Sequence, residues 1–532
     1  MHRYCWGLAA LGVVSPAIVS ASPIASRATG AASYVAHEDR LGAVKEAFQR
    51  AWDGYYEYAF PNDSLKPISK SYQNDRNGWG ASAVDAISTA LIMENEKVVK
   101  QIVEHIKNVD FTKTVKGGEN VSLFETTIRY LAGLVSAYDF LTGPFEGMID
   151  DDSVQIILDQ AVTLADALSV GFDTPSGVPI NDLVFNGPDG PRTKDVATNG
   201  IATIGTLILE WTRLSDLTGD KAYGELAKKG EEYLINVRNP EVGEPYPGLI
   251  GTDVYVKNGT FANGSGGWNG GTDSFYEYLI KMYLYDTERF GEYKDSWVKA
   301  IDSSIKYLTS HPTTRPDITF LAAYNGAGPE KLNFVSSHLA CFHGGNFILG
   351  GLTLDKQKYI DFGLKLVEGC HETYISTATG IGPESFRWQD NKLSPNASNN
   401  AAPPKDQKGF YDENGFWLSA ADYDLRPEVI ESYYYAYRAT GNTKYQDWAW
   451  DAFVNINRTC SAGVGFSAVT NVNEPDGGDF YDSQESFLFA EVLKYSYLIQ
   501  AGDAPYQVKA DHNNQWVFNT EAHPVRVAGK PI

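Results

Sequence analysis

Carboxylates at the starts of aromatic-rich helical segments are the residues of this 532-residue chain best suited to chemistry. Four such segments carry Glu125, Asp273, Glu428 and Glu491, which lie far apart in the sequence. Because an ionised carboxylate is costly to bury, several directed inward from different helices predict a shared polar cavity. Two opposed carboxylates in a cavity can hydrolyse a glycosidic bond, one protonating the leaving oxygen and the other activating water.

Helix capping is a simpler explanation for two of these segments. Ser122 precedes Glu125 by three residues, and Ser274 precedes Glu277 by three, which is the spacing of a capping box. Glu125 and Arg129 are four residues apart, so they share a helix face and could form a surface salt bridge. The local sequence therefore leaves capping and catalysis both open.

Three other features could serve catalysis or ligand binding. Pro427 favours a first helical turn, so Glu428 lies near a helix N-terminus, where the dipole stabilises the ionised form that a general base needs. Dipole compensation alone explains this position equally well. The glycine-rich approach to Asp273 lets the backbone come close to a ligand. Phe487 and Glu491 share a helix face, which pairs an aromatic ring with an acid.

Charge and motif content exclude several other functions. The formal net charge of −23 and the pI near 4.8 argue against nucleic acid and anionic membranes, which require surplus Lys and Arg. The chain has no P-loop, G-x-S-x-G or HExxH motif. The acidic run Asn473–Asp479 and the surroundings of Thr520 both fail the EF-hand pattern.

The N-terminus predicts entry into the secretory pathway. Trp6–Val19 is apolar but short for a membrane span, and a small-residue cleavage site follows it. We interpret residues 1–21 as a signal peptide, with an uncleaved anchor as the alternative, and residues 22–35 as a flexible linker. No other stretch is long and apolar enough to span a membrane, so we expect a protein that is secreted or held in the secretory-pathway lumen. We also expect a monomer.

Cysteines and sequons agree with this compartment. After removal of Cys5 with the signal, Cys341, Cys370 and Cys460 remain, which allows one disulfide and one buried thiol; the first two are nearest in sequence. Six N-x-S/T sequons are candidate glycosylation sites: Asn62, Asn120, Asn258, Asn263, Asn396 and Asn457.

Helical periodicity predicts an all-α fold. Roughly thirteen segments show apolar residues at i, i+3, i+4 and i+7, among them Ala81–Lys107, Ala197–Leu217 and Ser336–Leu352. Recurring helix pairs predict a solenoid that closes into an α/α barrel, with the acid-bearing helices inside. Long loops at Gly243–Gly271, Gly380–Phe416 and Ala462–Ser483, with short β-hairpins, could wall one mouth. We assign 36–525 to this single domain and 526–532 to a tail.

Taken in order, eight segments resemble the class I α-mannosidases of glycoside hydrolase family 47. These segments read FETTIRYLAGLVSAYD, ATIGTLILEWTRLSDLTGD, DSFYEYLIKMY, SSHLACFHGG, GIGPESFRW, LRPEVIES, ESFLFAEVLKY and FNTEAHP. The resemblance runs along nearly the whole chain after residue 36. It implies an (α/α)7 barrel and calcium-dependent, inverting, exo-acting removal of terminal α-1,2-linked mannose from high-mannose N-glycans. Within the family, the chain is most similar to the secreted fungal members.

The resemblance also implies residue roles. Glu125 would be the acid and Glu428 the base, and Asp273 would be a third catalytic carboxylate whose division of labour with Glu125 is open. Ca²⁺ would be held by the side-chain and carbonyl oxygens of Thr520, with waters completing its shell. A disulfide would join Cys341 to Cys370 and leave Cys460 free. Substrate- or water-shell positions are Arg129, His338, Glu384, Arg426, Glu431, Phe487, Glu491 and Glu521.

One position departs from the family pattern, and two other functions remain to be weighed. The usual DALDT string reads DAIST here, so Ser88 replaces an acid, which puts in doubt that acid's role in the cavity floor or in helix pairing. A mannosidase-like lectin without efficient turnover is the first alternative function, and retention of the catalytic carboxylates argues against it. A structural helical solenoid is the second, and it leaves the acidic cavity unexplained.

Overall fold

The computed structural model describes residues 34–532, except 116–119 and 188–189. The predicted signal peptide and nearly all of the predicted linker therefore lie outside the described residues. The last two linker residues contact the barrel, because Tyr34 Oη donates to the Arg438 carbonyl (2.8 Å) and Val35 N donates to Tyr437 Oη (3.1 Å). Arg438 also lies over the Tyr34 ring.

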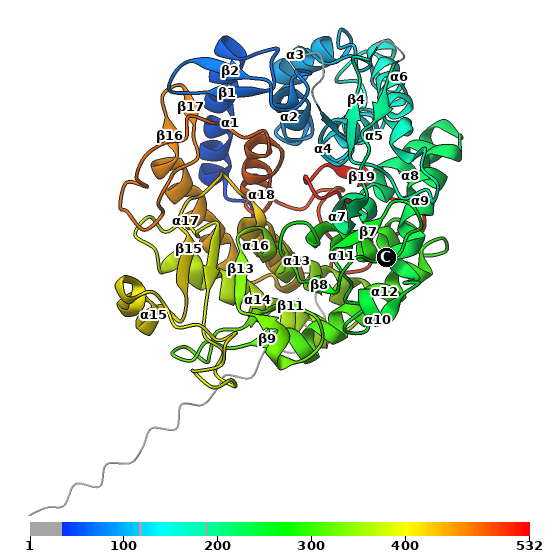
Figure 1. Ribbon diagram of the computed structural model, residues 1–532. Helices are drawn as coiled ribbons and strands as arrows, with labels where there is room; N and C mark the ends of the chain where they lie inside the picture. The colour runs from blue at the N-terminus through cyan, green and yellow to red at the C-terminus, as the bar shows by residue number, and fades with distance from the viewer. Residues whose placement is uncertain (1–33, 116–119, 188–189) are drawn as a thin grey trace, which may run out of the picture. The chain divides into compact units, whose positions relative to one another are not determined.

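Seven helices form a closed inner ring (Figure 1). They are α2 (Ala81–Ile92), α5 (Ala132–Leu141), α8 (Ile208–Thr218), α11 (Asp273–Tyr285), α13 (Phe342–Thr353), α16 (Glu428–Thr440) and α18 (Leu493–Leu498). Each packs against the next, and α18 packs back against α2. Every residue of α2 and of α13 is buried, so these helices are enclosed by protein on all sides, as expected for the interior of a large barrel.

Seven outer helices each pack on one inner helix. They are α3 (Glu96–Ile106), α6 (Asp151–Leu168), α9 (Ala222–Ile235), α12 (Gly291–Ser303), α14 (Gln357–Ile375), α17 (Lys444–Thr459) and α1 (Glu38–Tyr58). The first helix of the chain, α1, pairs with the last, α18, which closes the solenoid. The predicted all-α (α/α)7 barrel is therefore confirmed for the described residues.

Three predicted segments differ from the helices that form. Ala81–Lys107 is two helices, because Glu94 takes a positive φ of 56° and the Asn95 side chain accepts from Val98 N to begin α3. Ala197–Leu217 and Ser336–Leu352 both begin as strands. In each case a short strand pairs with a loop strand before the helix begins, so local apolar periodicity is overridden by tertiary pairing.

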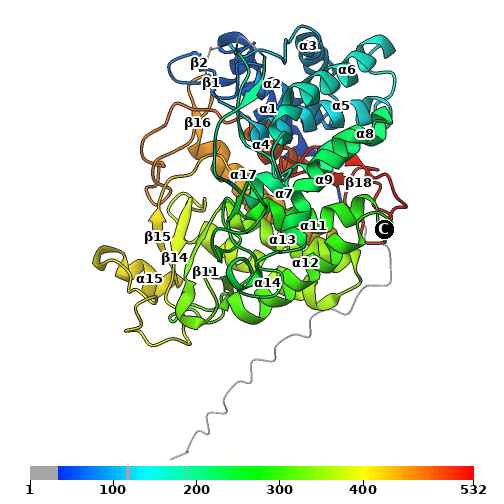
Figure 2. The same cartoon turned by 45° about the vertical axis from the view of Figure 1, so that its right-hand side comes forward.

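Short antiparallel strands gather mainly at one mouth of the barrel, along the left side of Figure 2. The strands are β1 (Ser64–Lys66), β2 (Ser71–Gln73), β3 (Val121–Ser122), β4 (Asp182–Val184), β5 (Arg192–Thr193), β6 (Thr198–Gly200), β7 (Asp253–Tyr255), β8 (Ser265–Gly266), β9 (Thr309–Ser310), β10 (Phe320–Leu321), β11 (Ala323–Asn325), β12 (Leu332–Asn333), β13 (Val335–Ser337), β14 (Ser385–Arg387), β15 (Trp417–Ala420), β16 (Ser461–Ala462), β17 (Gly465–Phe466), β18 (Trp516–Phe518) and β19 (Pro524–Arg526). The hairpin β18–β19 instead carries the C-terminal part of the chain into the barrel.

Short helical turns complete the fold. They are α4 (Leu123–Glu125), α7 (Ile201–Gly205), α10 (Pro240–Gly243), α15 (Lys408–Asn414), η1 (Thr126–Leu131), η2 (Ser169–Phe172), η3 (Ser304–Leu308), η4 (Pro329–Lys331), η5 (Leu339–Cys341), η6 (Lys405–Gln407) and η7 (Leu488–Val492). Three of them, η1, η3 and η7, are π-helical turns, of which η1 and η7 lead into the inner helices α5 and α18. Such turns are frequent at functional sites, and these two carry Arg129 and Glu491.

The predicted disulfide and tail are both ordered against the barrel. Cys341 and Cys370 form the disulfide that the resemblance implied, with their Cα atoms 6.0 Å apart, and Cys460 is a buried free thiol. In the predicted tail, Arg526 N donates to Asp139 Oδ2 (2.9 Å) and Gly529 N to the Tyr285 carbonyl (3.0 Å).

One helix corrects the prediction that no second stretch is long and apolar enough to span a membrane. Asp151–Phe172 meets that requirement by length and composition, and half of its apolar window is buried inside the fold. This segment comprises α6 and η2, and α6 packs against α5 and α3 of the barrel wall.

Candidate active site

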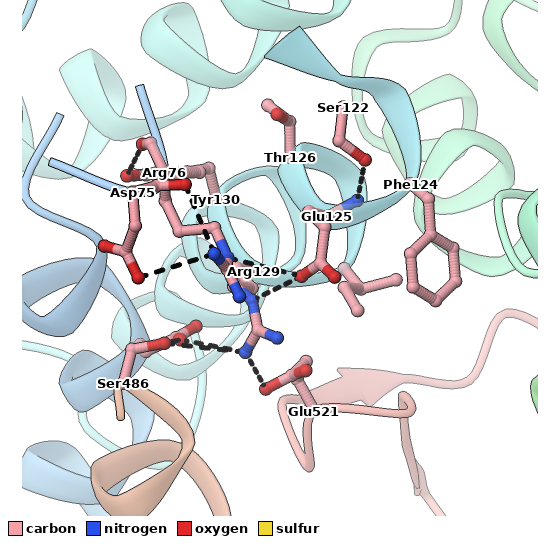
Figure 3. Close-up of polar contacts among 12 residues, drawn as sticks. Asp75, Arg76, Ser122, Phe124, Glu125, Thr126, Arg129, Tyr130, Ser486 and Glu521 are labelled. Carbon is pink, nitrogen blue, oxygen red and sulfur yellow. Dashed lines mark hydrogen bonds and ion pairs between the residues drawn. The ribbon is translucent and has the colours of Figure 1, made fainter. Parts of the chain in front are cut away.

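Glu125 combines a helix-start position with an ion pair to arginine (Figure 3). Ser122 Oγ accepts a hydrogen bond from Glu125 N (3.1 Å), so Ser122 caps the helix as predicted. The Glu125 carboxylate does not fold back to complete the capping box. Instead Glu125 Oε2 accepts from Arg129 Nε (2.8 Å) and lies 3.6 Å from Arg76 Nε. Capping and a cavity role thus coexist at this position.

Arg129 is buried at the centre of a carboxylate cluster, so the surface salt bridge considered from the sequence is wrong. Its side chain is 6% exposed, and Nη1 lies 3.5 Å from Asp85 Oδ2. Nη1 also lies 2.7 Å from Glu521 Oε2, in ion-pair contact but outside hydrogen-bond geometry. Burial alone would raise the pKa of Glu125, but the charges of Arg129 and Arg76 outweigh it and hold this pKa below its usual value.

Glu428 is the first residue of α16 and is bound by a buried histidine. His338 Nδ1 lies 2.6 Å from Glu428 Oε2, and His338 Nε2 lies 2.7 Å from Tyr374 Oη. Because an ionised carboxylate cannot donate, Nδ1 carries the proton, and a neutral ring then accepts from Tyr374 at Nε2. Burial would raise the pKa of Glu428, but His338 and Arg426 outweigh it and lower this pKa.

A second arginine and an aromatic ring connect the two carboxylates. Arg426 Nε donates to Glu384 Oε2 (2.5 Å), and the other Glu384 oxygen accepts from Asp424 N (3.0 Å). The Phe487 ring is contacted by both guanidinium groups, with Arg129 Cζ 5.5 Å and Arg426 Cζ 5.9 Å from its centroid. The Glu125 and Glu428 clusters therefore meet around one buried phenyl ring.

Asp273 is the first residue of α11 and differs from both in its charge environment. Burial, followed by the charges of Glu277 and Glu428, raises the pKa of Asp273 to about 7, despite a hydrogen bond from Ser274 N. The capping box predicted for Ser274 and Glu277 is wrong, because Ser274 Oγ accepts from Thr206 Oγ1 and Glu277 pairs with Lys281. Asp273 is therefore suited to carry a proton near neutral pH.

Glu431 and Glu491 are buried carboxylates that repel other carboxylates. Burial and the charge of Glu277 raise the pKa of Glu431, and burial and the charge of Glu521 raise that of Glu491. Among the described residues, neither has a salt bridge to Lys or Arg. Such a set of acids favours shared protons or a bound cation.

Thr520 lies in the tight turn between β18 and β19. Asn519 organises this turn, because its Oδ1 accepts from Glu521 N (3.0 Å) and from His523 N (2.8 Å). Ala522 takes a positive φ of 54° in the same turn. Within the described chain, neither the hydroxyl nor the carbonyl of Thr520 takes part in an intramolecular hydrogen bond, so both oxygens are available to a ligand.

Inner helices on several sides hold this turn. Thr520 N donates to Tyr278 Oη (3.2 Å), which in turn donates to the buried carboxylate of Glu210 (2.6 Å). Two buried lysines donate to the backbone of the turn: Lys281 Nζ to the Asn519 carbonyl (3.3 Å) and Lys494 Nζ to the Ala522 carbonyl (2.6 Å). The position of Thr520 is thus fixed by side chains from α8, α11 and α18.

Comparison with known families identifies the family of this chain. The Glycosyl hydrolase family 47 profile matches residues 47–527. The chain belongs to glycosyl hydrolase family 47. It is 53% identical over 524 residues to the probable mannosyl-oligosaccharide alpha-1,2-mannosidase 1B of Aspergillus flavus, covering 98% of each chain. It is 54% identical over 495 residues to the mannosyl-oligosaccharide alpha-1,2-mannosidase of Penicillium citrinum, covering 92% of this chain and 93% of that protein.

A solved family 47 structure agrees with this assignment. The alpha-1,2-mannosidase from Trichoderma reesei superposes with a TM-score of 0.89 at 50% identity, covering 93% of this chain and all of that chain. The predicted resemblance, the barrel and the expectation of a glycosidase are confirmed.

Several buried polar residues around the candidate site were given no site role by the sequence analysis: Asp85, Glu210, Glu277, Lys281, Tyr374, Lys494 and Asn519. A detectable signal existed for two of them. Lys281 follows Glu277 by four residues and Lys494 follows Glu491 by three, each inside an otherwise apolar helix. A buried lysine one turn from a buried acid predicts an internal polar network.

Ser88, where the family string has an acid, contacts the same network. Its hydroxyl lies 2.9 Å from His523 Nδ1, while His523 Nε2 lies 3.2 Å from Asp85 Oδ1. Burial lowers the pKa of His523 to about 4, despite the nearby Asp85 carboxylate. The contact between α2 and the C-terminal turn thus persists with a neutral hydroxyl in place of a second carboxylate.

The six sequons lie in different environments. Asn120, Asn258 and Asn396 are exposed. Asn62 Nδ2 donates to the Ala59 carbonyl, Asn263 Nδ2 donates to Asp253, and Asn457 lies half-buried on α17. Attachment of a glycan requires an accessible Nδ2. The exposed positions are therefore the better candidates for modification.

Proposed function

We propose that this enzyme removes terminal α-1,2-linked mannose from high-mannose N-glycans by inverting, exo-acting hydrolysis. The observation that carries the proposal is the electrostatic difference between Glu428 and Asp273: one pKa is lowered and the other is raised to about 7, although the two carboxyl groups are close enough for the charge of Glu428 to act on Asp273. Two carboxyl groups with separated pKa values are suited to act as base and acid. The names of the fungal relatives supply the sugar and the linkage.

Glu428 is the proposed general base. Its carboxylate is ionised, and its hydrogen bond from His338 fixes one oxygen, leaving the other to take a proton from the attacking water. The contact between His338 and Tyr374 holds the imidazole in place. Attack from the ring face opposite the leaving oxygen converts the α-anomer to the β-anomer.

The proton for the leaving oxygen comes from the pair Glu125 and Asp273. The resemblance gives the acid role to Glu125, but Arg129 and Arg76 keep the Glu125 carboxyl ionised. Asp273, with its pKa near 7, holds the proton in mildly acidic surroundings. We therefore assign the proton to Asp273, and assign Glu125 to orienting the leaving side of the substrate together with Arg129.

The residues around Thr520 fit a calcium ion. Thr520 offers two oxygen atoms without intramolecular partners, and oxygen is the ligand that Ca²⁺ prefers. In the described part of the chain, no cluster of three or more His, Cys, Asp or Glu side chains is arranged to ligate a metal directly. Glu431, Glu491 and Glu521 would act through waters, and a bound cation would supply hydroxyl coordination and neutralise their charge.

The location of the enzyme and its contacts with the substrate follow from this proposed function. N-glycans are carried by secretory-pathway proteins, so the enzyme is proposed to act in that lumen or outside the cell. Arg129, His338, Glu384, Arg426 and Phe487 are proposed to bind the mannose and its neighbour.

The test is mannose release from α-1,2-linked mannobiose by purified enzyme with calcium. We expect release from this disaccharide and none from the α-1,3- or α-1,6-linked isomers. Binding of an intact high-mannose glycan without release would instead support the lectin. Neither release nor binding would contradict both functions.

A further inference from the structure

A ladder of backbone hydrogen bonds runs from His338, the partner of the proposed base, to an exposed aromatic loop. His338 N donates to the Glu384 carbonyl (3.0 Å), and Glu384 N donates to the Asp422 carbonyl (2.8 Å). Tyr423 and Val469 exchange both backbone hydrogen bonds, at 2.9 and 3.0 Å. These contacts bring the segment after β17, drawn in orange in Figure 1, alongside the strand that leads to Glu428.

The last step of the ladder places Tyr481. Val469 pairs with Phe480, and Tyr481 N donates to the Ala468 carbonyl (3.0 Å). The Asp482 carboxylate accepts from Ile68 N (2.7 Å) and so ties the loop to the β1–β2 hairpin. Tyr481 therefore sits on an anchored backbone four strand spacings, roughly 19 Å, from His338.

Tyr481 is an exposed aromatic residue two strand spacings from Asp424, because Asp424, Ala468 and Tyr481 follow one register of the ladder. The residue is 54% exposed. Slight burial, and then the negative charges of Asp422, Asp424 and Glu384, raise the pKa of its phenol. Glu384 binds Arg426, which lies two residues before the proposed base, so these acids connect the loop to the proposed active site.

Such a ring beside carboxylates has the chemistry of a sugar platform. The C–H face of a pyranose packs on an aromatic ring, while neighbouring carboxylates accept hydrogen bonds from its hydroxyls. Four strand spacings separate the backbones of Tyr481 and His338, which places Tyr481 outside the subsite of the mannose proposed at Glu428. We infer that Tyr481, with Asp422 and Asp424, binds a mannose residue of the uncleaved part of a branched glycan. This inference rests on the proposed function.

The experiment compares two substrates with the same scissile linkage. Tyr481→Ala should leave kcat/KM for α-1,2-linked mannobiose within about twofold, because this disaccharide does not reach the loop. For an intact high-mannose N-glycan it should lower kcat/KM about three- to tenfold, chiefly through KM, the effect of losing one exposed ring contact. Tyr481→Phe and Tyr481→Trp should restore the glycan rate, since both keep the ring.

Phe480→Ala is the matched control. Phe480 is the adjacent aromatic residue, 38% exposed, and successive residues of a paired segment point to opposite faces. It should leave both rates within about twofold. Equal loss on both substrates in Tyr481→Ala, or no loss on the glycan, would overturn the inference. A wild-type enzyme that releases mannose from neither substrate would instead overturn the proposed function.

Discussion

The carboxylates of the cavity fall into two groups that differ in their cationic partners. Glu125 and Glu428 have cations beside them, Arg129 for the first and Arg426 for the second, and their pKa values are lowered. Asp273, Glu431 and Glu491 face other carboxylates, and their pKa values are raised. Both groups come from the first turns of inner helices or from the short helical turns that lead into them.

The contrast teaches that position on a helix does not decide the role of a carboxylate here. Both Asp273 and Glu428 are the first residue of an inner helix, so the helix dipole acts on both. Their pKa values separate because Glu428 gains His338 and Arg426, whereas Asp273 gains Glu277 and Glu428 as neighbours. Neighbouring charge thus divides one structural motif into a base and an acid.

The largest expected effect comes from removing the base. Glu428→Gln keeps the hydrogen bond with His338 possible but cannot accept a proton from water, so kcat should fall by about 10² to 10⁴-fold. Steady-state rates on α-1,2-linked mannobiose measure this, with circular dichroism to verify folding. Glu225→Gln, an exposed glutamate in the first turn of α9, is the control and should change nothing. Near-normal turnover in Glu428→Gln would place the base elsewhere.

Calcium removal should have the next largest effect, because it acts on the acids proposed to surround the ion. EDTA should abolish turnover and added Ca²⁺ should restore it, because the bound ion neutralises repulsion among Glu431, Glu491 and Glu521. Calcium should also raise the free energy of unfolding, by about 2.7 kcal/mol at a hundredfold excess over Kd.

Thr520 variants separate this binding from activity. Thr520→Val should lose the calcium-dependent rise in thermal stability, whereas Thr520→Ser, which keeps the hydroxyl, should retain it. Indifference of both stability and turnover to chelation would remove Thr520 from the proposed role.

The smallest expected effect is a shift in the pH profile. Turnover requires ionised Glu428 and protonated Asp273, so kcat/KM should be highest between the Glu428 pKa, below 4.5, and the Asp273 pKa near 7. Above that value it should fall about tenfold per pH unit. Glu277→Gln removes one charge that raises the Asp273 pKa, so it should move the alkaline limb to lower pH. An alkaline limb that does not move would separate it from Asp273.

The barrel and the main site residues could be predicted because their signals are local or ordered along the chain. Apolar periodicity predicted most of the inner and outer helices, and the order of the motifs singled out Glu125, Asp273 and Glu428 as candidate site residues. The predicted helix boundaries were wrong where a segment pairs with residues that are distant in the sequence. The strand starts of α7 and α13 depend on pairing with distant loops, which no local pattern carries.

Distant packing also explains what was missed inside the site. The surface salt bridge expected for Arg129 is buried, because Asp85 and Glu521 reach it from opposite ends of the chain. Lys494 appears as an ordinary helix residue in the sequence, yet it donates to the turn that holds Thr520. The capping box predicted at Ser274 does not form, because the Ser274 hydroxyl accepts a hydrogen bond from Thr206 Oγ1.

The anomeric configuration of the first mannose released tests the central claim most directly. Proton NMR of α-1,2-linked mannobiose hydrolysis, recorded with calcium and before mutarotation, reports it. The account predicts that β-mannose appears first, because Glu428 directs water to the ring face opposite the bond that Asp273 protonates. Release of α-mannose first, or no release at all, would contradict it.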